Sequence, residues 1–214
     1  MIELIAAIAV FILSHVIPAY GPCRQGLINL LGKRLYIALY SALSVVVVVW
    51  LGFAFIDAPY IELWGQPAWT RWVPLLGMPV GCVLFIGGFW ASNPLSLSIS
   101  KADFDPARPG LIGLSRHPVI MAFALWTLVH LAPNGDVASV LMFGLLTGLS
   151  FYGPYTINKR KKQQLGEAAW QHLAASRGTL RGSNGWLIGI IGGGAFYFLL
   201  LWAHEWVLGV SPLP

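Results

Sequence analysis

Stretches of mostly apolar residues recur along the chain, and six of them are long enough to cross a lipid bilayer as helices. A spanning helix needs about 20 predominantly apolar residues, because each residue advances it by about 1.5 Å through a hydrocarbon layer about 30 Å thick. The predicted spans are Ile2–Tyr20, Tyr36–Phe55, Val73–Trp90, His117–Ala132, Val137–Tyr155 and Trp186–Val210. This pattern predicts an all-α fold, a polytopic transmembrane helical bundle of about six helices.

Lysine and arginine residues gather in alternate loops between these spans. Twelve of the thirteen lie in the first, third and fifth loops, and Arg71 is the exception. They are Arg24, Lys33, Arg34, Lys101, Arg108, Arg116, Lys159, Arg160, Lys161, Lys162, Arg177 and Arg181. Because short basic loops are retained in the cytoplasm, we predict that these loops lie inside and that both termini lie outside.

The composition excludes an ordinary soluble enzyme. Apolar residues make up 57% of the 214 residues and charged residues only 10%, whereas soluble domains carry about 25% charged residues. The net charge of +5 does not indicate nucleic-acid binding, because the basic residues lie between apolar spans rather than on one face. We therefore expect the lipid bilayer as a partner and no nucleic acid, and a single transmembrane domain over residues 1–214.

Three further patterns concern packing and the inner surface. Gly189 and Gly193 have the small-xxx-small spacing that lets two helices approach closely. The polar segment 158–184 includes KRKKQQLGEAAWQHL, which predicts an amphipathic helix at the inner surface. Trp90, Trp170 and Trp186 are expected to form an inner aromatic belt.

Four of the five histidines lie in or at the ends of the apolar spans, where polar groups are expensive and often functional. The predicted orientation places His15 and His117 toward the inner side and His130 and His204 toward the outer side. About 20 Å of helix separates His117 from His130, so one metal ion cannot bind both. The fifth histidine, His172, is expected at the surface.

Two neutral imidazoles from facing helices can hold the iron of a buried haem b, which makes these histidines candidate metal ligands. Arg24 or Arg116 would then pair with the haem propionates. The alternative is that each histidine only hydrogen-bonds a neighbouring helix. A helix is also expected to begin at Pro118, because proline suits the first helical position. His117 and Arg116 then precede exposed backbone amides, which indicate either an anion site at the helix N-terminus or an ordinary helix start.

Several long motifs resemble the NnrU family of bacterial membrane proteins, which is linked to nitrite and nitric oxide metabolism in denitrifiers. They are SHVIPA with the following Arg24, LGKRLYIALYSALS, NPLS, the central SRHPVIMAFALWTLVHLAPNGDVAS, KRKKQQLGEAAW and AHEWVLGVSPL. The stretch AASRGTLRGSNGW after Trp170 departs from the family pattern. The resemblance implies a multi-pass protein of the bacterial inner membrane that supports denitrification, with nitric oxide reductase components as partners.

The same family is similar to the 15-cis-zeta-carotene isomerases, which are haem b membrane enzymes. The two histidines implicated there match His15 and His130, so the resemblance implies these residues as the iron ligands, whereas the depth argument pairs His15 with His117. The resemblance also implies an alternative function, the haem-dependent isomerisation of a polyene such as 15-cis-zeta-carotene.

Two other functions stay open. The protein is a non-catalytic assembly factor if all its histidines are packing groups. Arg-His-Pro before an apolar helix also looks like the S-adenosylmethionine-dependent membrane methyltransferases that act on isoprenylated cysteine. Those enzymes carry an acidic pair where this chain has Lys161 and Lys162. Whether the protein is an enzyme is not decided by the sequence.

Overall fold

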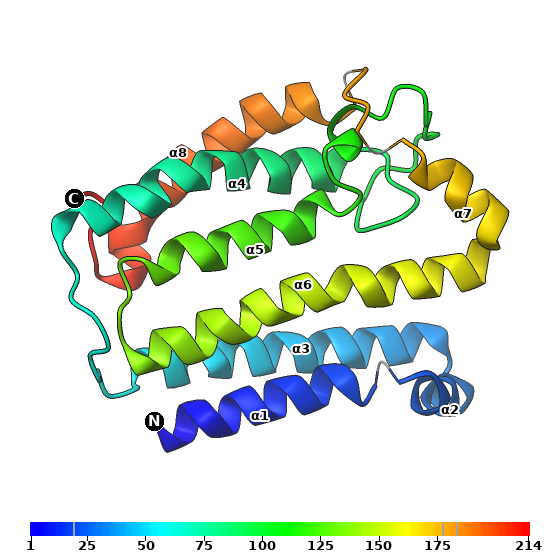
Figure 1. Ribbon diagram of the computed structural model, residues 1–214. Helices are drawn as coiled ribbons and strands as arrows, with labels where there is room; N and C mark the ends of the chain where they lie inside the picture. Colours follow the sequence, from blue (N-terminus) through cyan, green and yellow to red (C-terminus); the bar gives the residue numbers. More distant parts are fainter. Residues whose placement is uncertain (19, 177, 183) are drawn as a thin grey trace. The chain divides into compact units, whose positions relative to one another are not determined.

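The computed structural model describes residues 1–18, 20–176, 178–182 and 184–214. Within these ranges the chain forms helices and loops, with one isolated β-bridge between Glu62 and Asp136 (Figure 1). The chain forms two compact units: residues 1–63 with 136–142, and residues 64–135 with 143–214. The helices are α1 (Ile2–Val16), α2 (Gly21–Leu31), α3 (Lys33–Ile56), η1 (Ala68–Arg71), α4 (Trp72–Trp90), η2 (Gly110–Gly113), α5 (Pro118–Leu131), α6 (Val137–Leu165), α7 (Glu167–Ala174) and α8 (Trp186–Leu208).

In the first unit, α1 packs against α3. The buried residues of α1 are Leu4, Ala7 and Phe11, which recur at the three- and four-residue spacing of one helix face. The hydroxyl of Tyr36 on α3 donates a hydrogen bond to the carbonyl of Pro18 at 2.9 Å. This contact fastens the beginning of α3 to the chain that leaves α1.

In the second unit, α4 packs against both α5 and α8 (Figure 1). The contact between α4 and α8 is close, because a Cβ atom on Gly193 would lie 2.7 Å from Cα of Val83, and one on Gly189 would lie 3.1 Å from Cα of Gly87. The packing role predicted for Gly189 and Gly193 is therefore confirmed. Helix α4 also continues through Pro79 without a break.

The long loop between α4 and α5 is partly buried, although it has almost no regular structure. Leu95, Leu111 and Ile112 are each fully buried. The side chain of Asn184 holds this loop by accepting a hydrogen bond from the backbone N–H of Ser92 and donating to the carbonyls of Ser92 and Pro109. The loop is therefore part of the core of the second unit.

The prediction of one amphipathic helix over KRKKQQLGEAAWQHL is wrong, because the segment is divided between two helices. Its basic half continues α6 as far as Leu165, and its second half forms the separate helix α7. Gly166 separates the two with a φ of 81°, which L side chains rarely adopt. Trp170 on α7 is buried, with 9% of its surface exposed, so it is not a member of an exposed aromatic belt.

Four helical segments are long and apolar enough to cross a membrane: Lys33–Ile56, Ala68–Trp90, Val137–Leu165 and Trp186–Leu208. Helix α1 qualifies only when it is taken with α2 as one bent span, and α5 is apolar but only 14 residues long. The all-α bundle is confirmed, whereas two of the six predicted spans are shorter than expected.

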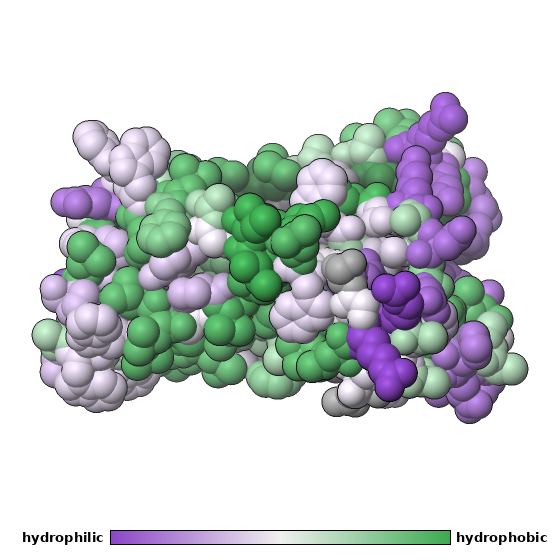
Figure 2. Space-filling view, turned by 90° about the horizontal axis from the view of Figure 1, so that it is seen from above, coloured by the Kyte–Doolittle hydropathy of each residue, from purple (hydrophilic) through white to green (hydrophobic). Residues whose placement is uncertain are grey.

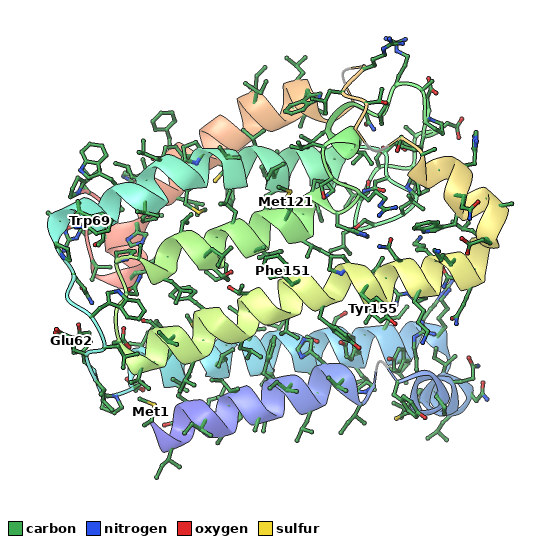
Figure 3. All side chains as sticks on the ribbon, viewed as in Figure 1. Met1, Glu62, Trp69, Met121, Phe151 and Tyr155 are labelled. Carbon is green, nitrogen blue, oxygen red and sulfur yellow. The ribbon has the colours of Figure 1, made fainter. Side chains whose placement is uncertain are left out.

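Large apolar side chains remain exposed on these helices, which a water-soluble protein would bury. Figure 2 shows hydrophobic residues over large areas of the face in view. In Figure 3, Phe151 and Tyr155 project from α6, and more than 60% of each is exposed. Their exposure indicates contact with lipid, so the chain is a membrane protein.

Within the second unit, the C-terminal ends of α4 and α6 lie beside the N-terminal ends of α5 and α8 (Figure 1). The described basic residues of the predicted third loop lie in the loop at this end, and those of the predicted fifth loop lie in the last turns of α6 or, for Arg181, in the loop before α8, whereas Arg177 is outside the described residues. Arg71, the exception, lies at the opposite end of α4. The basic residues that the sequence places in alternate loops therefore gather at one end of this unit, which we call the basic end.

Candidate functional site

His15 lies in the last turn of α1, half-buried beside aromatic rings. Its Nδ1 is 2.8 Å from the carbonyl oxygen of Phe11, one helical turn earlier. Because a carbonyl can only accept, Nδ1 carries the proton and Nε2 carries the lone pair. The rings of Phe11 and Tyr40 lie 4.3 and 6.1 Å from the imidazole, centroid to centroid. No protein hydrogen bond occupies Nε2 among the described residues.

His130 has the same arrangement in the last turn of α5. Its Nδ1 is 2.8 Å from the carbonyl oxygen of Trp126, again four residues earlier. The rings of Trp126 and Phe143 lie 6.0 and 5.9 Å from the imidazole. As in His15, the tautomer leaves the lone pair on Nε2, and the surroundings are aromatic.

His204 on α8 is the second histidine of the predicted outer pair. Its Nδ1 donates to the carbonyl of Val210 at 2.8 Å. Both members of the predicted outer pair belong to the second unit.

His117 differs from the other three because both of its ring nitrogens are occupied. Nε2 donates to Oδ1 of Asn158 at 3.2 Å, which leaves Nδ1 to accept from the hydroxyl of Ser96 at 2.8 Å. With 6% of its surface exposed, His117 joins the loop before α5 to α6. These bonds give it a packing role and leave no ring nitrogen for a metal.

The two candidate haem pairs, His15 with His117 and His15 with His130, each join residues of the two units. The two pairs differ in the hydrogen bonds of their second histidine. His130 retains a lone pair, whereas His117 does not. The structure holds no cluster of three or more histidine, cysteine or carboxylate side chains that could bind a metal ion, within the described part of the chain. His172 is exposed, as expected.

Each of the arginines proposed to pair with propionates lies against an aromatic ring. The guanidinium of Arg24 is 5.7 Å from the ring centre of Tyr36 in the first unit. The guanidinium of Arg116 is 5.1 Å from the ring centre of Trp170 in the second. Their pairing with propionates stays a prediction.

The beginning of α5 has the predicted local form, with Pro118 at the first helical position after His117. Pro118 and Val119 are both buried, and a Cβ atom on Gly88 of α4 would lie 2.8 Å from Cβ of Pro118. The first turn is therefore covered by α4. This packing favours an ordinary helix start over a separate anion site at its amides.

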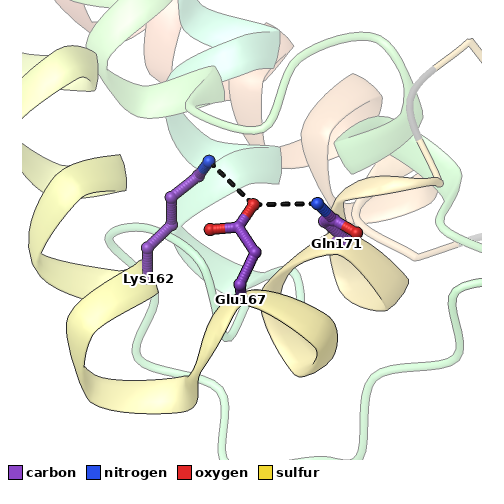
Figure 4. A network of polar contacts seen from close by, with 3 residues as sticks. All are labelled: Lys162, Glu167 and Gln171. Atoms are coloured by element: carbon purple, nitrogen blue, oxygen red, sulfur yellow. Dashed lines mark hydrogen bonds and ion pairs between the residues drawn. The ribbon is translucent and has the colours of Figure 1, made fainter.

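A polar cluster that the sequence did not indicate surrounds Trp170. The ammonium of Lys162 lies 4.3 Å from the centre of the indole ring that Arg116 also contacts. Lys162 pairs with Glu167 at 3.1 Å, and Glu167 accepts a second hydrogen bond from Gln171 (Figure 4). The signal in the sequence was a tryptophan that follows a run of four basic residues, because both basic and aromatic side chains are enriched near the membrane surface.

An aromatic pocket of about 440 Å³ lies next to the end of α5. Trp64 lines it, and its Nε1 donates to the carbonyl of Ala132 at 3.3 Å. Trp69, labelled in Figure 3, precedes α4 at the same end of the unit. The lining residues are Trp64, Gly65, Pro67, Trp69, Thr70, Leu131 and Ala132, of which the last two directly follow His130.

Comparison with known proteins gives one result. The family model described as NnrU protein matches residues 3–212. No curated protein and no solved structure matches the chain. Since the match covers nearly every residue, from α1 to the end of α8, the chain belongs to the NnrU family.

Proposed function

We propose that this protein binds haem b in the bacterial inner membrane through His15 and His130, and that it supports nitrite and nitric oxide metabolism. One observation carries the haem proposal. In both histidines Nδ1–H donates to the carbonyl four residues earlier at 2.8 Å, so that Nε2 keeps its lone pair. Histidines that ligate metals almost always donate their other ring N–H in this way.

The surroundings of both histidines suit an apolar porphyrin. Phe11 and Tyr40 flank His15, and Trp126 and Phe143 flank His130. The pairing of these two histidines comes from the resemblance to the haem b isomerases. Bound haem would supply one-electron chemistry, while the protein holds each imidazole in the ligating tautomer.

Single substitutions test the ligands. Replacing His15 or His130 with Gly is expected to abolish low-spin haem binding, measured as haem per protein after purification. Added imidazole is expected to restore the low-spin spectrum, because it can occupy the space of the missing ring. His117→Gln serves as the matched control and should retain haem. Full haem content in both glycine variants would refute the ligand assignment.

The physiological role requires a separate test in cells. A strain lacking this protein should consume nitric oxide more slowly under denitrifying conditions, and the wild-type gene should restore the rate. A gene carrying His130→Gly should not restore it. Unchanged nitric oxide consumption in the deletion strain would contradict this role without affecting the haem proposal.

A second candidate function is the haem-dependent isomerisation of a polyene. The aromatic pocket favours it, because it has the size of typical small-molecule sites and is lined by the two residues that follow His130. Incubation of the reduced, haem-loaded protein with a tri-cis polyene should then yield an isomer with the same mass and a shifted absorption spectrum. Absence of any conversion would exclude this candidate.

A further inference from the structure

The indole nitrogen of Trp170 is a buried hydrogen-bond donor that has no partner among the described residues. An indole N–H can only donate, and buried polar groups in folded proteins nearly always find a partner. Trp170 lies on α7, outside the helices long enough to cross a membrane. An unpaired donor at this position indicates a ligand that can accept a hydrogen bond.

Two cations lie against the same indole ring. The guanidinium carbon of Arg116 is 5.1 Å and the ammonium of Lys162 is 4.3 Å from the ring centre. Each cation is attracted to the ring, but the two repel each other. Glu167 pairs with Lys162 at 3.1 Å and so offsets its charge (Figure 4).

The three residues come from three elements that meet at the basic end of the second unit: the loop before α5, the end of α6 and α7. Lys159 and Arg160 on α6 are exposed nearby in sequence. Basic residues at the end of a membrane bundle lie at the level of the lipid headgroups, where phosphate is the abundant anion.

We propose that Arg116, Lys162 and the indole N–H of Trp170 bind a phosphate group. A phosphate has several oxygens and can accept hydrogen bonds from an arginine, a lysine and an indole at the same time. It can be the headgroup of an anionic phospholipid or inorganic phosphate. None of the histidines proposed to ligate haem belongs to this site, although Arg116 is also predicted to pair with a haem propionate. Variants at Lys162 and Trp170 therefore test the phosphate site without changing a residue of the haem proposal.

The test uses the full-length protein in phosphatidylcholine nanodiscs. Its thermal unfolding is measured as phosphatidylglycerol replaces part of the lipid and, separately, as inorganic phosphate is added. Stabilisation by phosphatidylglycerol alone would identify a lipid headgroup, and stabilisation by inorganic phosphate would identify a soluble anion. Either result supports a phosphate site, whereas no stabilisation by either probe would overturn it.

Matched variants separate this site from general surface charge. Lys162→Gln and Trp170→Phe are each expected to weaken phosphate binding by about tenfold, because each removes one donor while keeping most of the side-chain volume. Lys159→Gln removes the same charge outside the cluster and should leave binding almost unchanged. Equal losses in Lys162→Gln and Lys159→Gln would show only non-specific attraction and would overturn the proposal.

Glu167→Gln provides a change in the opposite direction. It removes the carboxylate that competes for Lys162, so phosphate should bind more tightly than in the wild type. More than a third of each side chain in this pair is exposed, so neither Glu167→Gln nor Lys162→Gln disturbs the core. Weaker binding in Glu167→Gln would contradict the assignment of Lys162 to the site.

Discussion

The histidines of this chain differ in their hydrogen bonds rather than in their positions within apolar segments. His15, His130 and His204 each donate from Nδ1 to a backbone carbonyl, whereas His117 uses both ring nitrogens with Ser96 and Asn158. Hydropathy places all four near the ends of spans. Because a tautomer depends on partners brought close by folding, the sequence alone could not separate the packing histidine from the candidate ligands.

Substitution of His117 is expected to reduce stability without changing haem content. His117→Ala leaves Ser96 and Asn158 without a shared partner in a mostly buried site, and the expected cost is about 1–3 kcal/mol. Reversible unfolding in detergent measures this loss. Loss of haem from a variant that is still folded would instead make His117 a ligand.

The stability of α7 should depend on pH through Glu167. Hydrogen bonds from Lys162 and Gln171 favour the ionised carboxylate and hold its pKa below the ordinary value. The stabilisation is therefore complete above the ordinary glutamate pKa of about 4.3 and is lost as the pH falls through the lowered value. The protection of the α7 amides, measured relative to the intrinsic exchange rate at each pH, should fall over this acidic range in the wild type but not in Glu167→Gln, and equal pH profiles would contradict the account.

At the scale of elements, hydropathy predicted where helices begin better than where they end. The predicted start of α6 at Val137 and that of α8 at Trp186 agree with the structure. Helix α6 nevertheless continues well beyond the predicted Tyr155, because lysine, arginine, glutamine and leucine are good helix formers in water as well. The sequence also did not predict the burial of Trp170, because its partners are distant in sequence or lie on another helix: Arg116 comes from the loop before α5, and Lys162 comes from α6.

A side chain at Gly193 should disturb the close contact between α4 and α8. An added methyl group would lie 2.8 Å from the carbonyl oxygen of Cys82, which is fixed in the backbone of α4. We expect Gly193→Ala to lower stability by about 1–3 kcal/mol. Gly194→Ala on the same helix meets open space and should change stability by less than about 0.5 kcal/mol. Equal unfolding transitions of the two variants would refute the close packing.

The loop between α4 and α5 should lose its fixed structure when Asn184 is replaced. Asn184→Ala leaves backbone groups of Ser92 and Pro109 without their side-chain partner, at a cost of about 1–3 kcal/mol for a buried group. Limited proteolysis should then cut residues 91–109 faster. Ser100→Ala removes only an exposed hydrogen bond in the same loop and serves as the control; equal cleavage of the two variants would count against the role of Asn184.

At the scale of the whole molecule, the distribution of basic residues predicts the orientation in the membrane. With Cys23 replaced by Ser, a cysteine at Gly65 is expected outside and one at Asp103 inside, and both positions are exposed. A maleimide that cannot cross membranes should label Gly65→Cys in intact cells and Asp103→Cys only after lysis. The reverse pattern would invert the predicted topology.

Haem binding is the central claim, and the absorption spectrum of the purified full-length protein tests it most directly. After expression with added haem precursor and reduction with dithionite, haem b held by two histidines would give a sharp α band. The band should disappear in His130→Gly and return with imidazole. A colourless wild-type protein that remains folded would contradict the account.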